Sequence, residues 1–159
     1  MLWSSVAKEP PIADPRQRVL NLRVQAAEET VNAAKLYCKV THFETVAAKL
    51  LVRRLELQEE AEMLTSTGKQ HYAKMKEHQE AIAEREDLKA TLGPEVIRRR
   101  DKAVKYASQA SAKEKKMAET EDMIRTALGN AERLRRERDM MLVQARKFEA
   151  EAVRAGGPA

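Results

Sequence analysis

The chain contains little of what builds a compact domain. Its 159 residues include five glycines and one cysteine, and only 4% of them are aromatic. Few glycines leave few places for tight turns, and few aromatic rings leave little bulk to fill a wide hydrophobic core. These scarcities argue against a globule built around a sheet and favour elongated helical structure.

The single cysteine and the lack of long apolar runs bear on where the chain resides. Cys38 has no second cysteine with which to form an internal disulfide, so we expect an intracellular, cytoplasmic or cytoskeletal protein. No run approaches the roughly 18 apolar residues that span a bilayer, so we expect no transmembrane helix. Residues 1–8 lack acids, as organelle presequences do, which leaves a mitochondrial location open, but they also lack arginine.

Apolar residues recur every seven positions in two columns of the N-terminal half. The first column contains Leu22, Glu29, Leu36, Phe43, Leu50, Leu57, Leu64, His71, His78, Arg85 and Leu92, and the second contains Val19, Ala26, Ala33, Val40, Ala47, Arg54, Ala61, Gly68, Met75 and Ile82. Alternating spacings of three and four residues, kept over several heptads, predict a helix that supercoils with a partner helix.

The C-terminal half repeats this pattern. One column contains Ala103, Ala110, Met117, Ile124, Ala131, Arg138, Ala145 and Ala152, and the other contains Tyr106, Thr120, Ala127, Leu134, Met141 and Phe148, with Lys113 as an interruption. Between the halves, Gly93 and Pro94 predict an elbow, because glycine suits the position after a helix and proline suits the first position of the next. We therefore predict an all-α fold, a long antiparallel helical hairpin with coiled-coil packing and arms at residues 14–92 and 94–155.

The ends of the predicted hairpin follow from local residue types. Asp14 followed by Pro15 is a helix-start pair, an oxygen-bearing N-cap and a residue whose fixed φ suits the first helical position. Pro10 and Pro11 precede it and disfavour helix, so we predict a disordered leader at 1–13 and a flexible tail at 156–159.

An elbow at Gly93-Pro94 fixes which residues face each other. Facing residue numbers would sum to about 186, so Arg54 would lie near Glu132 and residues 19–30 would overhang the end of the other arm. Gly68 and Gly129 lie within the arms, where a glycine costs about 1 kcal/mol relative to alanine. A break at these glycines would give the alternative fold, a bundle of three or four shorter helices.

The N-terminal arm carries a second apolar stripe, roughly opposite its heptad columns. The stripe comprises Leu20, Val24, Ala27, Val31, Ala34, Cys38, Ala48, Val52 and Leu55. A helix that is apolar on two faces needs two partners, whereas a two-helix hairpin supplies one. We therefore predict that residues 20–55 contact another protein or a second copy, the alternative being that alanines simply fill exposed positions.

The net charge of +5 lies in the middle of the chain, where residues 69–116 hold thirteen basic and eight acidic side chains. From these thirteen basic side chains we select Lys69, Lys74, Lys76, Arg98, Arg99, Arg100, Lys102 and Lys105 on either side of the predicted elbow. We interpret them as a basic tip that attracts an anionic partner, against the alternative of an ordinary solvated helix surface.

Residue patterns for catalysis or metal binding are missing. The sequence has no glycine-rich phosphate loop and no nucleophile elbow, and His71 and His78 are two helical turns apart, too far to share a metal ion. We expect no catalytic site, no metal or other cofactor and no small-molecule substrate.

Two functions are consistent with these features. The first is a non-catalytic coiled-coil structural or scaffold subunit of a larger assembly, such as a cytoskeletal complex, that docks through residues 20–55 and presents the basic tip. The second is a module that binds an anionic surface through that tip, namely structured RNA, an acidic filament surface or a membrane.

Overall fold

A computed structural model describes residues 14–156 of the chain, and nearly all of them are helical. Helix α2 spans Pro15–Glu84, a short 3-10 helix η1 spans Glu86–Leu88, and helix α3 spans Lys89–Gly156. No strand occurs among these residues. The all-α helical hairpin is therefore confirmed. The predicted leader at 1–13 and the last three residues of the predicted tail, 157–159, lie outside the described residues.

Helix α2 begins where the sequence predicted. The backbone N–H of Arg16 donates to the Asp14 side chain at 3.0 Å, and Pro15 is the first helical residue. This bond satisfies one of the amide groups that the first turn of a helix leaves without an intrahelical partner. Pro15 has no amide hydrogen to satisfy, so it fits this position without cost.

The predicted elbow at Gly93-Pro94 is wrong, because the turn lies earlier. Helix α2 ends at Glu84, Arg85 is extended (φ −136°, ψ 101°), and the amide of Leu88 donates to the Arg85 carbonyl at 3.1 Å. Gly93 and Pro94 lie inside α3. Pro94 removes one helical hydrogen bond near the start of α3. The missing Cβ of Gly93 relieves the clash that makes most residues before proline leave the helix.

Neither internal glycine interrupts its helix, so the alternative bundle of shorter helices is not observed. Gly68 is buried where the two helices approach closely. A Cβ placed on it would lie 3.4 Å from the Cβ of Tyr106 and 3.5 Å from the Ala103 carbonyl oxygen. Gly129 has open space around the position of a Cβ, so the cost of this glycine is one of helix propensity alone.

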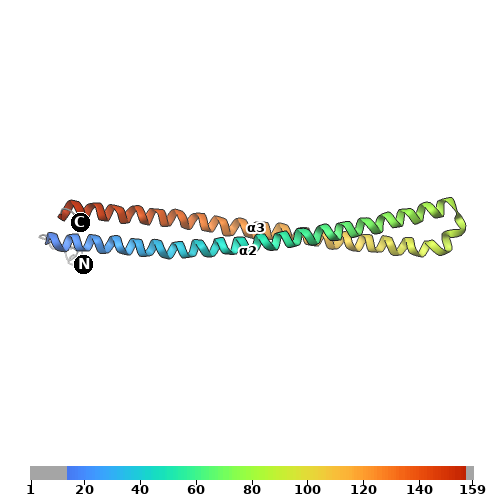
Figure 1. The fold of residues 1–159 in the computed structure, drawn as a ribbon, viewed down its shortest axis with the longest axis horizontal. Helices are drawn as coiled ribbons and strands as arrows, with labels where there is room; N and C mark the ends of the chain where they lie inside the picture. Colours follow the sequence, from blue (N-terminus) through green and yellow to red (C-terminus); the bar gives the residue numbers. More distant parts are fainter. Residues whose placement is uncertain (1–13, 157–159) are drawn as a thin grey trace, which may run out of the picture. The chain divides into compact units, whose positions relative to one another are not determined.

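The described residues form two units, one of residues 14–45 with 127–156 and the other of residues 46–126. In each unit α2 and α3 lie side by side and run in opposite directions (Figure 1). Within the first unit, Leu36 and Val40 pack with Ala131 and Leu134, and Phe43 and Met141 are partly buried against this cluster.

The register between the helices differs from the predicted one. Facing residue numbers sum to about 175 rather than about 186, because each residue by which the turn moves changes the sum by two. In the second unit Arg54 consequently pairs with Glu121 and not with Glu132. In the first unit Val19 lies directly against Gly156, so the predicted overhang of residues 19–30 is also wrong.

The heptad columns are the buried face of both helices, but the predicted first column continues too far: Arg85 is exposed at the turn and Leu92 belongs to α3. Leu57 and Val40 are 1% exposed, and Ala131 and Ala152 are 1% and 0% exposed. The buried residues with small side chains are Ala26, Ala33, Ala47, Ala61, Ala110, Ala127, Ala131, Ala145 and Ala152. Small side chains at these positions let the backbones of the two helices approach closely.

Leu57 and Leu55 allow a matched test of this seam. We expect Leu57→Ala to lower the free energy of unfolding by about 2 to 5 kcal/mol, because it removes a fully buried side chain and leaves a cavity. Leu55 is 55% exposed on the other side of the same helix, so Leu55→Ala should change it by less than about 0.5 kcal/mol. Urea unfolding followed by circular dichroism measures the free energy of unfolding of both variants. Equal losses would contradict the burial of Leu57 between the two helices.

Pro94 allows a test of the turn. Inside α3 the ring of Pro94 costs a hydrogen bond, so Pro94→Ala should stabilise the hairpin by up to about 3 kcal/mol. The same change at Pro15, the first residue of α2, should leave stability nearly unchanged. Thermal unfolding of the two variants and the wild type provides the measurement. A destabilising Pro94→Ala would place the turn at Gly93-Pro94 instead.

Candidate interaction surfaces

The predicted apolar stripe lies exposed on α2 in the first unit. Leu20, Val24 and Val31 are 55%, 48% and 54% exposed, and the Cys38 thiol is also exposed. Ala27 and Ala34, which complete this part of the stripe, are exposed as well. A two-helix packing that buried these residues would have to expose the heptad columns, so the stripe is a second apolar face of the same helix.

The stripe keeps the spacing of a coiled-coil seam. Its positions in the first unit follow one another at intervals of four and three residues, and Thr41 and Thr45 continue that spacing. In the second unit Val52 and Leu55 extend it, at 57% and 55% exposure. Sequence reasoning found the stripe but not this periodicity, which the interval between its members could have revealed.

The predicted basic tip is not at the tip. All eight of its residues lie in the second unit, but the turn is at Arg85–Leu88, so Arg98 begins about 15 Å along α3 from Leu88. We call these eight residues, Lys69, Lys74, Lys76, Arg98, Arg99, Arg100, Lys102 and Lys105, the basic band. The error has the same cause as the misplaced elbow.

The residues around the actual turn are predominantly acidic. Residues 77–97, which we call the turn segment, contain six acidic and two basic side chains. The acidic residues are Glu77, Glu80, Glu84, Glu86, Asp87 and Glu95. Glu86 and Asp87 lie in η1, directly before α3, whose own first turn has no acidic side chain.

Part of the basic band is neutralised by neighbouring acids. Lys74 pairs with Glu77 at 3.2 Å and Arg98 with Glu95 at 2.8 Å. The bond from Arg98 holds the pKa of Glu95 below its ordinary value, against the opposing effect of burial. Lys69, Lys102 and Lys105 have no ion-pair partner within residues 14–156.

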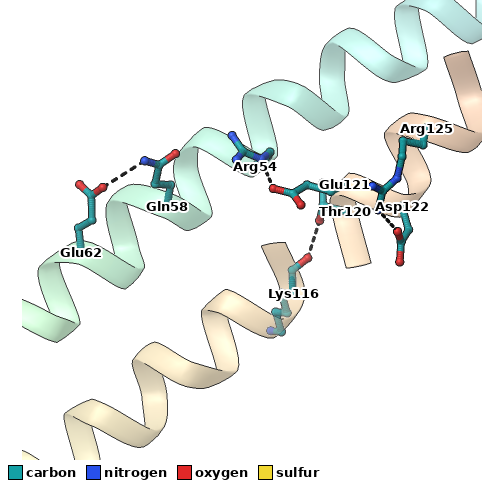
Figure 2. A network of polar contacts seen from close by, with 8 residues as sticks. All are labelled: Arg54, Gln58, Glu62, Lys116, Thr120, Glu121, Asp122 and Arg125. Atoms are coloured by element: carbon teal, nitrogen blue, oxygen red, sulfur yellow. Dashed lines mark hydrogen bonds and ion pairs between the residues drawn. The ribbon is translucent and has the colours of Figure 1, made fainter. Parts of the chain in front are cut away.

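Polar residues also bridge the two helices of the second unit. The Arg54 guanidinium donates to Glu121 at 2.7 Å, and Figure 2 shows the two side chains meeting between α2 and α3. The Lys113 ammonium lies 2.8 Å from Glu60, and this bond lowers the pKa of that carboxyl although burial opposes it. Such pairs, partly exposed, contribute little stability but disfavour registers that would separate them.

His71 forms a further polar contact in the seam of the second unit. Its Nδ1 lies 2.8 Å from Nη1 of Arg99, and its ring stacks on Tyr106 with centroids 5.5 Å apart and planes 5° apart. Burial lowers the pKa of His71, and the positive charges of Arg99, Lys102 and Arg98 lower it further. The neutral imidazole can accept the hydrogen bond from Arg99, whereas the imidazolium cannot.

The concave regions of the second unit are open grooves along the helix pair. One, of about 700 Å³, is lined by Arg54, Glu62, Lys69, Glu114 and Met117 among others. A second, of about 420 Å³, is mostly apolar and lies beside Tyr72 and Val104. Within residues 14–156 no group of three or more metal-ligating side chains is close enough to hold an ion, and neither helix has a segment able to cross a membrane.

Comparison with protein-family models, with curated proteins and with solved structures found no match for this chain. The interpretation of these surfaces therefore depends on their own chemistry.

The His71 contact predicts a pH dependence of stability. Because its pKa in the folded chain lies below the usual value of about 6.5, the unfolded chain binds the proton more readily. The contribution of neutral His71 to the free energy of unfolding is complete well above that pKa and is lost as the pH falls from about 7.5 towards 5.5. We expect His71→Gln to show a smaller fall in melting temperature over this range than the wild type.

His42→Gln is the matched control for this measurement. His42 is exposed in the other unit, stacked edge-on against its neighbour Phe43. His42→Gln leaves the contact between His71 and Arg99 in place, so the pH dependence that this contact causes should remain. An unchanged pH dependence in His71→Gln would show that protonation of this residue does not oppose folding.

Proposed function

We propose that this chain is a non-catalytic coiled-coil subunit of a larger assembly, and that it docks a partner helix along the second apolar stripe of α2. The observation that carries this proposal is the spacing of the exposed residues. Leu20, Val24 and Val31 repeat the intervals of the buried seam, yet each is about half exposed. A repeat of this kind is what a helix needs to pack against another helix by knobs-into-holes contacts.

The stripe differs from scattered surface hydrophobics in its composition. One of its columns has small or long side chains, such as Ala27 and Leu55, and the other contains Val24, Val31 and Val52, which are β-branched, together with Cys38. Isolated apolar residues on a surface need no explanation, but a periodic row on the face opposite the core does. The function we propose is mechanical, since the hairpin supplies a fixed surface that positions another helical protein.

A second candidate function is supported by the basic band. The amines of Lys69, Lys102 and Lys105 have no acidic partner within the described residues, and such unneutralised charge attracts polyanions. We rank it second because the same unit also carries an acidic turn segment, which repels a continuous anionic surface.

The docking proposal can be tested by photocrosslinking in cells. A photoreactive phenylalanine analogue is placed at Val24 or Val31 on the stripe, or at the matched exposed positions Gln25 and Asn32 on another side of α2. We expect the stripe positions alone to give a discrete adduct, identified by mass spectrometry as one helical protein or as a second copy. Adducts of equal yield from both sets, or none from the stripe, would contradict the proposal.

A substitution pair shows whether the stripe acts by binding or by folding. Val24→Glu combined with Val31→Glu should abolish the adduct formed from a photoreactive group at Leu20. Because both residues are exposed, the melting temperature of the purified chain should stay within a few degrees of the wild type. Gln25→Glu with Asn32→Glu adds the same charge off the stripe and should leave the adduct in place.

A further inference from the structure

The second unit carries two surfaces of opposite charge on one helix pair. The turn segment, with six acidic and two basic residues, has a net charge of −4. The stretches 69–76 and 98–105, which contain the basic band, hold eight basic residues and Asp101, a net charge of +7. Because α2 and α3 are antiparallel in this unit, both stretches lie at the same level, next to the turn segment.

Charges without a local partner remain on both surfaces. Within residues 14–156, Glu80, Glu84 and Glu86 of the turn segment form no ion pair, and all three are exposed. Asp87 is already paired with Arg85 at 2.9 Å. On the band, Lys69 and Lys105 are exposed and without an acidic partner in the same range. Each surface thus displays charges that internal contacts leave unneutralised.

Exposed apolar side chains lie among the residues of the basic band. Tyr72 and Val104 are 48% and 64% exposed, and they border the apolar groove of about 420 Å³ that contains Gly68 and Ala107. The turn segment contributes Ile97, which is 52% exposed. Charge alone steers association, whereas apolar contact adds affinity, so a surface with both is suited to a protein partner.

We propose that two copies of this chain associate through their second units, the turn segment of each copy lying over the basic band of the other. The copies run in opposite directions about a two-fold axis, so both acidic-to-basic contacts form together and the interface is closed. From Asp87 to the middle of the band is about 15 residues, or about 22 Å of helix, which sets the length of the overlap.

A second copy fits these surfaces better than an unrelated acidic protein does. An acidic partner on the band would leave the negative charge of the turn segment uncompensated. That charge would also lie close to the negative charge of the partner and repel it. A second copy neutralises both surfaces with one interface, because the two charges belong to the same chain. This interface does not use the α2 stripe, which stays open for the partner of the proposed function.

The first measurement is the mass of the purified full chain by light scattering coupled to size exclusion, at about 0.1 M and 1 M salt. We expect a dimer at low salt and a monomer at high salt, because the screening length falls from about 10 Å to about 3 Å. A monomer at low salt overturns the proposal. A dimer that persists at high salt overturns it too, and indicates self-association through an apolar surface such as the stripe.

Charge reversal supplies the decisive comparison. The turn variant carries Glu80→Lys, Glu84→Lys and Glu86→Lys, and the band variant carries Lys69→Glu, Lys102→Glu and Lys105→Glu. None of these six residues is in an ion pair within the described residues, so the hairpin should keep its helix content. Each variant alone brings like charges together, and we expect its dimer dissociation constant to rise at least about tenfold.

An equimolar mixture of the two variants should restore the dimer. The reversed turn segment of one then faces the reversed band of the other, and the two native surfaces face each other. We expect a dissociation constant within about threefold of the wild type. A mixture that stays monomeric, or variants that dimerise as well as the wild type, would overturn the proposal. Neutral Glu→Gln and Lys→Gln versions replace any variant that loses helix content, and each should weaken the dimer.

The same proteins separate this proposal from polyanion binding. Retention of the wild type on immobilised double-stranded RNA, together with a monomeric mass at low salt, would overturn self-association and favour the second candidate function. In that case the band variant should lose retention, because it removes the lysines that contact phosphate. The turn variant should be retained more strongly, because it replaces acids that repel phosphate.

Discussion

Packing of small side chains along one face of each helix is the constraint on which the hairpin depends. In the first unit Ala26, Ala33 and Ala131 are at most 2% exposed, and they bring the backbones close enough for Val40 to be fully enclosed. Larger residues at the alanine positions would force the helices apart and leave voids between them. In the second unit a Cβ on Gly68 would already be in van der Waals contact with Tyr106 and the Ala103 carbonyl oxygen, so the helices are close there as well.

That close approach fixes the register, and polar residues then restrict it further. Arg54 with Glu121 and Lys113 with Glu60 join opposite helices in the second unit, and Arg135 with Glu44 does so in the first, at 2.6 Å. A slip by one heptad would keep apolar residues facing each other but would separate these charges. His71 against Arg99 belongs to the same class, with the difference that its hydrogen bond depends on a neutral ring.

The outer surfaces of the helices carry an apolar stripe and charged side chains that take no part in the packing between α2 and α3. A helix that buries one heptad face and exposes another has two possible neighbours, and only one of them is present in the hairpin. The separation of acidic and basic side chains in the second unit adds a surface governed by salt rather than by apolar contact. Salt screens contacts between charges far more than contacts between apolar groups, so the two surfaces respond differently to ionic strength.

The sequence by itself determined the helical class, the start of α2 at Asp14 and Pro15, and the buried columns, because these depend on periodicity and on contacts within one or two turns. It did not determine the turn. Gly93-Pro94 is a strong local turn signal, but a helix can continue through it because glycine has no Cβ to clash with the proline ring. Only packing decided that the chain reverses at Arg85–Leu88, because the register that buries both columns is a property of two helices together. The distance of the basic band from the turn and the partner of Arg54 both depend on where the turn lies. No local pattern could therefore have predicted them.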